Sequence, residues 1–83
     1  MVTPESIKAS IASGLDCDTA EVTGDGHHFE ALIVSPEFRG LSRIARHRLV
    51  YAALGERMRE EVHALSMVTV TPEEREAGLG AGG

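Results

Sequence analysis

Residues 42–65 have the sequence SRIARHRLVYAALGERMREEVHAL. Ser42 can cap a helix, because its hydroxyl can accept a backbone N–H that has no partner in the first turn. Behind it, apolar side chains recur at helical spacing on one face: Leu41, Ala45, Leu49 and Ala52. Three more apolar side chains lie on the opposite, mainly basic side: Val50, Ala53 and Leu54. The stretch predicts a central core helix that runs to about Glu60 despite Gly55, with its middle buried on nearly all sides.

The same stretch ends at His63, which lies between Val62 and Ala64 just before an apolar, strand-like run. Neutral imidazole is a good ligand for iron and for other borderline metals. The alternative is a structural histidine that hydrogen-bonds a backbone carbonyl where helix gives way to strand. Our hypothesis is that His63 is a metal ligand.

Helix and strand signals alternate along the rest of the chain. Thr3 and Thr71 can each cap a helix, and each is followed by proline at the first helical position, where a missing N–H costs nothing. Residues 24–26 (GDG) indicate a tight hairpin turn. We expect helices over residues 4–13, 42–60 and 72–77, and strands over residues 19–23, 29–34 and 64–70. The predicted order is α-β-β-α-β-α, an α+β fold.

The composition is typical of one ordinary globular domain. The sequence has 83 residues, of which 42% are hydrophobic and 25% are charged. A chain this short buries roughly 60 to 65% of its unfolded surface and supports a single core. No apolar run approaches the roughly 18 residues of a membrane-spanning helix, and residues 1–15 lack the pattern of a signal peptide. We expect one domain over residues 1–77, a flexible glycine-rich tail over residues 78–83 and a cytoplasmic location.

The charges are unevenly distributed. Eight Lys and Arg against thirteen Asp and Glu give a net charge of -5, which argues against strong nucleic-acid binding by the chain as a whole. A local basic cluster nevertheless forms a candidate partner-binding or nucleic-acid-binding face: Arg39, Arg43, Arg46, His47 and Arg48. The alternative for these side chains is an ordinary solvated helix face.

His27 and His28 lie at the predicted hairpin and are the other candidate metal ligands. Adjacent side chains of an extended chain point to opposite faces, so at most one of the two can easily join His63 at a shared metal. Two imidazoles do not complete a four-coordinate site, and the chain has no Cys-x-x-Cys or His-x-x-x-His spacing to supply the rest. Such a half-site predicts a partner that contributes thiolates.

Cys17 is the only cysteine, which excludes an internal disulfide. Its neighbours Asp16 and Asp18 should raise the pKa of the thiol, so we expect an ordinary thiol rather than a ligand. None of the candidate nucleophiles Cys17, Ser35 and Ser66 has a recognisable base, and no glycine-rich phosphate loop precedes a helix. We predict a protein that is not an enzyme.

Four motifs occur at a characteristic mutual spacing. They are Phe38-Arg39-Gly40, Arg46-His47-Arg48-Leu49-Val50-Tyr51, Val62-His63-Ala64-Leu65 and Thr71-Pro72-Glu73-Glu74. Through these motifs the chain resembles the BolA family, and within it the short-looped, IbaG-like bacterial branch. The resemblance covers about residues 3–76. Two features depart from the family pattern, since the last helix carries no tryptophan and the hairpin loop is short.

The resemblance implies a three-stranded sheet with helices packed on it, similar to a type II KH domain but without that domain's GxxG loop. It also implies a monothiol glutaredoxin partner and a role in iron-sulfur cluster assembly or iron sensing. In the mixed pair, a [2Fe-2S] cluster is shared with the glutaredoxin cysteine and a glutathione thiolate. The family's invariant histidine ligand matches His63, and its variable loop ligand matches His27 or His28. We favour His28, because many bacterial members of the family resemble this chain in having a histidine directly before a phenylalanine, and His27 remains the alternative.

The alternative function is a nucleic-acid-binding transcriptional regulator that uses the basic face of the central helix. The KH-like order of elements and the clustered arginines motivate it. About four phosphate contacts would give a log-log salt slope near -3 to -4 on duplex DNA. The free chain is either a monomer or a homodimer, and we expect neither a cluster in the isolated chain nor contact with a membrane.

Overall fold

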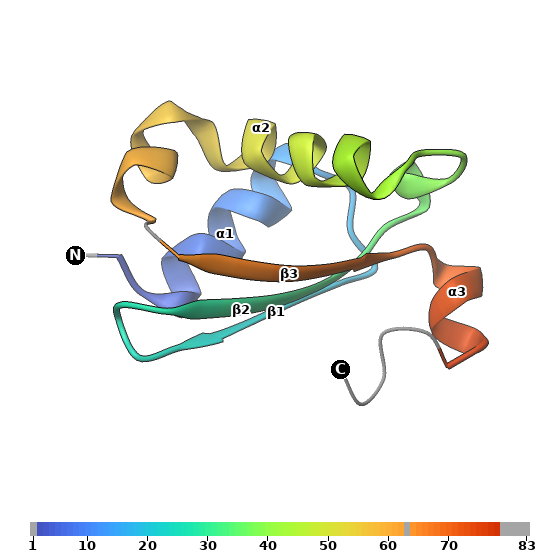
Figure 1. Ribbon diagram of the computed structural model, residues 1–83, viewed down its shortest axis with the longest axis horizontal. Helices are drawn as coiled ribbons and strands as arrows, with labels where there is room; N and C mark the ends of the chain where they lie inside the picture. Colours follow the sequence, from blue (N-terminus) through green and yellow to red (C-terminus); the bar gives the residue numbers. More distant parts are fainter. Residues whose placement is uncertain (1, 63, 79–83) are drawn as a thin grey trace.

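The computed structural model describes residues 2–62 and 64–78, with the backbone alone for residues 57–61. The helices are α1 (Pro4–Gly14), α2 (Arg43–Glu61) and α3 (Pro72–Glu76), with a short 3-10 helix η1 (Pro36–Phe38), and the strands are β1 (Thr19–Gly24), β2 (Phe29–Val34) and β3 (Leu65–Val70). Figure 1 shows these elements in the predicted α-β-β-α-β-α order, which is confirmed. Within the described residues, no helix is long and apolar enough to cross a membrane. Of the predicted glycine-rich tail over residues 78–83, residues 79–83 lie outside the described residues.

The three strands form one sheet in the order β1-β2-β3. The hairpin pairs β1 and β2 antiparallel, with Thr23 opposite Glu30. After β2 the chain crosses through α2 and returns as β3, which pairs with β2 in parallel and places Phe29 opposite Leu65. The parallel pair therefore aligns the start of β2 with the start of β3, although a long stretch of chain separates them.

Helices α1 and α2 both lie on the same face of the sheet (Figure 1). The residues between these helices and the sheet are almost fully buried, and the largest apolar ones at 0% exposure are Ile7, Ile11, Ile33, Phe38 and Val50. Successive side chains of a strand point to opposite faces of the sheet. The face away from the helices therefore carries exposed residues, which include Glu21, Thr23, Glu30, Ser66 and Val68. The core is thus a single layer of side chains between one sheet face and two helices.

The burial of α2 differs from the predicted pattern. Among its described side chains, Val50 and Leu54 are the buried ones, at 0% and 5% exposure, whereas Arg48 and Ala52 are exposed. The prediction of a middle buried on nearly all sides is wrong, because α1 and the sheet cover only one side of the helix. The helical conformation also breaks at Gly55, where φ is 81°, a value that glycine adopts without the steric cost of a side chain.

The capping prediction at α3 is confirmed. The hydroxyl of Thr71 accepts the Glu74 backbone N–H at 3.1 Å, and the Glu74 carboxylate accepts the Thr71 N–H at 2.8 Å. This reciprocal pair satisfies two donors that the first turn leaves free. It also holds the carboxylate of Glu74 in place beside the end of β3.

Candidate functional site

The hairpin that carries the two histidines is ordered by Asp25. One oxygen of its carboxylate accepts the backbone N–H of His27 at 2.8 Å and that of His28 at 2.9 Å. These two bonds lower the pKa of Asp25 below its ordinary value, because they stabilise the ionised carboxylate. The turn therefore uses the backbone of both histidines and leaves both residues exposed.

The two histidines differ in what lies beside them. Phe29, which follows His28, donates its backbone N–H to the carbonyl of Ala64 at 2.9 Å. A hollow of about 370 Å³ at this end of the sheet is lined by residues that include His28, Phe29, Ala64 and Ser66. His27 is not among the residues that line it. The structure thus brings His28 next to the segment that starts β3.

His63, the predicted ligand from the other segment, lies outside the described residues. It is bonded directly to Ala64 in the sequence. Within the part of the chain that the structure describes, no group of three or more His, Cys, Asp or Glu side chains could hold a metal ion. The ligand roles of His63, His28 and His27 therefore stay predictions.

Cys17 is half-buried, and its thiol donates to the carbonyl of Leu15 at 3.4 Å. Burial raises the pKa of this thiol most, and the negative charges of Asp16, Glu37 and Asp18 raise it further. The predicted direction is confirmed. The larger cause, burial, and the contribution of Glu37 come from the fold and leave no local signal in the sequence.

Ser35 is completely buried at the end of β2. Its hydroxyl donates to the carbonyl of Asp16 at 2.5 Å and accepts the backbone N–H of Glu37 at 3.0 Å. Both of these bonds hold the connection between β2 and η1. The hydroxyl of Ser35 therefore has a structural role in this fold.

Arg39, at one end of the predicted basic face, is paired with an acid from α3. Its guanidinium donates to both carboxylate oxygens of Glu73, at 2.7 and 2.6 Å. Both side chains are more than half exposed, so solvent screens the pair and its net contribution to stability is small.

Arg46 is held more tightly and lies largely inside the protein. Its guanidinium donates to the carbonyls of Leu41 and Thr69, each at 3.0 Å, and reaches the carboxylate of Glu74 at 2.6 Å. Only 13% of its side chain is exposed, and the group also lies 5.9 Å from the centre of the Phe38 ring. Arg46 therefore joins α2, β3 and α3, and its charge is offset within the fold.

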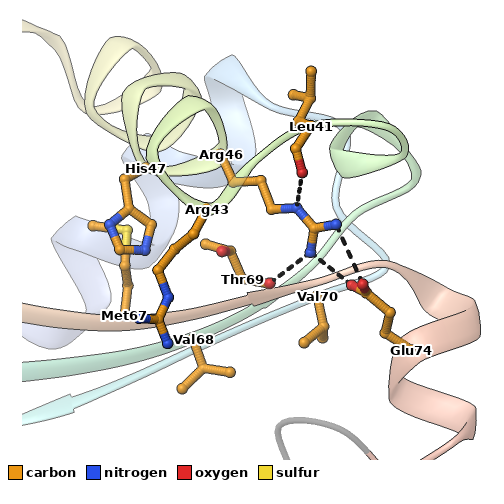
Figure 2. A pocket seen from close by; sticks show the side chains of 9 residues that line it. All are labelled: Leu41, Arg43, Arg46, His47, Met67, Val68, Thr69, Val70 and Glu74. Atoms are coloured by element: carbon orange, nitrogen blue, oxygen red, sulfur yellow. Dashed lines mark hydrogen bonds and ion pairs between the residues drawn. The ribbon is translucent and has the colours of Figure 1, made fainter.

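Two further members of the basic face, Arg43 and His47, line a groove between α2 and β3. Figure 2 shows Arg43 and His47 reaching from α2 towards Met67 and Val68. The groove has a volume of about 360 Å³ and is lined by Leu41, Arg43, Arg46, His47, Glu74 and the β3 residues 67–70. Within it the Nε2 atom of His47 is buried and has no hydrogen-bond partner among the described residues.

Arg48 is exposed and does not line this groove. The five predicted residues therefore do not form one continuous free basic surface, since Arg39 and Arg46 are neutralised by Glu73 and Glu74. Sequence reasoning missed these two acids as partners. Both acids occur in the motif Thr71-Pro72-Glu73-Glu74, but their distance from the arginines along the chain hid the pairing.

Comparisons with known proteins give consistent matches over most of the chain. The family model described as BolA-like protein matches residues 2–74. The structure of a bolA protein homologue from Coxiella burnetii superposes with a TM-score of 0.76 at 51% identity, and the match covers 92% of this chain and 99% of that one.

Two curated relatives extend the comparison. Protein BOLA2 of Arabidopsis thaliana is 45% identical over 71 residues, which cover 81% of this chain and 75% of that protein. The DNA-binding transcriptional regulator BolA of Haemophilus influenzae is 37% identical over 54 residues, which cover 65% of this chain and 52% of that protein. Sequence and fold similarity therefore agree across nearly the whole described chain.

Proposed function

Since the chain belongs to the BolA family, we propose that it is an adaptor that pairs with a monothiol glutaredoxin. Together the two proteins bind a shared [2Fe-2S] cluster that serves iron-sulfur assembly or iron sensing. The observation that carries this proposal is the juxtaposition of His28 with Ala64, the residue that follows His63 in the chain. Two segments distant in sequence thereby meet at the same end of the sheet: one carries His28, and the other includes Ala64, which directly follows His63 in the sequence.

The residues at this end suit a shared cluster. His28 is exposed, so its imidazole can meet a partner without any opening of the core. Imidazole ligands suit iron, and they raise the potential of a [2Fe-2S] cluster relative to thiolates. His28 and His63 would supply this chain's ligands, and the thiolates of the glutaredoxin and of glutathione would supply the others.

The lining of the hollow favours His28 over His27 as the loop ligand. His28 lies beside Ala64 and Ser66, whereas His27 does not line the same hollow. The bonds from both backbone N–H groups to Asp25 fix the turn that sets this difference. His27 is therefore the natural control for His28, because it shares the loop and the exposure.

The test is co-purification of the chain with a monothiol glutaredoxin and glutathione, followed by visible absorption and circular dichroism. We expect His63→Ala and His28→Ala to shift the cluster spectrum and to speed cluster loss, while His27→Ala leaves both unchanged. An unchanged spectrum in His63→Ala would exclude this histidine as a ligand. A shift in His27→Ala without one in His28→Ala would exchange the roles of the two loop histidines.

DNA binding is a second candidate function, favoured by the name of the Haemophilus relative. Because Arg39 and Arg46 are paired with acids, Arg43 and Arg48 are the arginines of the basic face left to contact phosphates. Two such contacts give a log-log salt slope of about -2 on duplex DNA. Binding measured across a range of salt concentrations tests this, and a flat salt dependence would count against it.

A further inference from the structure

We propose that the groove between α2 and the free edge of β3 binds an extended peptide that carries a carboxylate. The peptide adds to β3 as a further strand, and Arg43 binds the carboxylate. This site lies towards the end of β3, at residues 67–70. The hollow beside His28 lies at the start of β3. The inference goes beyond the proposed adaptor function and does not depend on it.

The hydrogen-bonding pattern between β2 and β3 shows which backbone groups of β3 are available to pair with another strand. Phe29 donates to the carbonyl of Ala64, and Ser35 donates to the carbonyl of Val70. In a parallel ladder alternate residues bond to the same neighbour, so the even-numbered residues of β3 bond to β2. The odd-numbered residues, including Met67, direct their N–H and C=O groups to the other edge.

That other edge is largely open in the described part of the chain. Since β3 is the last strand of the sheet, no further strand covers it. The one hydrogen bond that the described residues make there is from Arg46 to the carbonyl of Thr69, at 3.0 Å. Met67 is therefore free to donate to and accept from an added strand, which is a common mode of peptide recognition.

The shape of the groove fits a chain segment better than a single ion. Four consecutive residues, 67–70, form one wall, and at about 3.3 Å per residue they span roughly 13 Å. The opposite wall is the first two turns of α2, which presents Arg43 and His47 (Figure 2). A strand laid between these walls would run along the edge of the sheet.

The charges of the groove define the chemistry of the peptide. Arg46 and Glu74 offset each other at 2.6 Å, which leaves the exposed Arg43 as the uncompensated charge among the lining residues. A carboxylate on the peptide would neutralise it.

The groove also offers an apolar contact for the peptide. Val68 is 37% exposed and is one of two large exposed hydrophobic residues in the described structure. It lines the groove at the strand edge, and alternate side chains of an added strand would cover it. The competing interpretation is that Arg43 only protects the edge from aggregation, as charged side chains commonly do on edge strands.

The test is a titration of the isolated ¹⁵N-labelled chain, without iron or glutaredoxin, with three short peptides of alternating valine and threonine. One ends in a free carboxylate, one has an amidated end and an internal glutamate, and the third is amidated and uncharged. We expect amide shifts and slowed amide exchange at Met67 and its neighbours for the charged peptides only. The first two peptides distinguish a terminal from a side-chain carboxylate.

The matched variants are Arg43→Gln and Arg48→Gln, which remove exposed arginines from the same helix, one inside the groove and one outside it. We expect Arg43→Gln to weaken binding of the charged peptides about tenfold and Arg48→Gln to leave it unchanged. No shifts with any peptide at millimolar concentration, or equal affinity for the uncharged peptide, would overturn the proposal. Shifts of the same amides by a short DNA duplex but not by the peptides would overturn it in favour of nucleic acid.

Discussion

At the residue scale, Arg46 is the side chain whose role the fold changes most. The sequence places it in a basic cluster, whereas the structure buries it between two backbone carbonyls and the carboxylate of Glu74. A guanidinium has five N–H donors in a fixed plane, so it can satisfy three partners from a loop, a strand and a helix. Arg46 is thus a structural residue that lines the groove.

Replacement of Arg46 by methionine tests this role. The variant keeps an apolar stem of similar length but leaves two carbonyls and a carboxylate without their donor. We expect the free energy of unfolding to fall by about 2–3 kcal/mol, measured by urea unfolding. Arg48→Met, at an exposed position on the same helix, should change it by less than about 0.5 kcal/mol, and equal effects of the two variants would contradict the assignment.

The ion pair between Arg46 and Glu74 should make the stability of the protein depend on pH. Hydrogen bonds from Arg46, and then from the Thr71 backbone, lower the pKa of Glu74 from 4.5 to about 2. Because the folded state favours the ionised carboxylate, this stabilisation is present above about pH 4.5 and is lost as the pH falls towards 2. Stability should therefore decline over this range.

The measurement compares urea unfolding midpoints of the wild type and of Glu74→Gln at about pH 6 and about pH 3. We expect the variant to lose less stability between these pH values than the wild type does. Asp25 and Glu73 also have lowered pKa values, so part of the pH dependence should persist in the variant. Identical pH dependence in the two proteins would contradict the pairing.

At the element scale, α1 and α2 approach each other closely at Gly14. A Cβ atom at this position would lie 2.7 Å from the Cα atom of Ala53. Backbone atoms cannot give way as a flexible side chain can, so Gly14→Ala would force the two helices apart. We expect a loss of about 1–3 kcal/mol in the free energy of unfolding.

The control for this variant is Lys8→Ala, at an exposed position on the same helix. It should change the free energy of unfolding by less than about 0.5 kcal/mol, since it removes no packed atoms. Thermal unfolding of both variants by circular dichroism provides the comparison. A fully stable Gly14→Ala variant would show that the helices do not pack at this separation.

The elements themselves follow closely from local signals. Helix α1 was expected over residues 4–13 and β1 over residues 19–23, and each extends one residue further. A capping threonine followed by proline marks a helix start, and Asp-Gly marks a hairpin turn. Both signals depend on contacts between residues a few positions apart, so they can be recognised in the sequence alone. The buried side of α2 depends instead on which elements pack against it, and no local pattern specifies that.

At the scale of the whole molecule, the parallel pairing of β2 and β3 separates two surfaces. The start of β3 lies at the hairpin, beside His28, and its end forms the groove beside Arg43. The sequence indicated the histidines and the arginines as candidates, but it could not show that Glu73 and Glu74 neutralise two of the arginines. Contacts between residues far apart in the chain decide which candidates stay available.

The adaptor proposal makes a specific statement about which atoms coordinate the iron-sulfur cluster. The cluster end of this chain would contribute imidazole nitrogen, and the thiolates would come from the partner. Sulfur-only ligation would instead leave the hairpin and the start of β3 without a metal-binding role. The identity of the ligand atoms therefore separates the two possibilities directly.

The most direct test is electron-nuclear double resonance on the reduced cluster of the complex, with ¹⁵N-histidine incorporated into this chain only. The proposed function predicts ¹⁵N couplings to the cluster from this chain, with one lost in His63→Ala and another lost in His28→Ala. The His27→Ala complex should keep both. A cluster that forms in the complex but shows no ¹⁵N coupling from this chain would contradict the claim that it is shared through histidine.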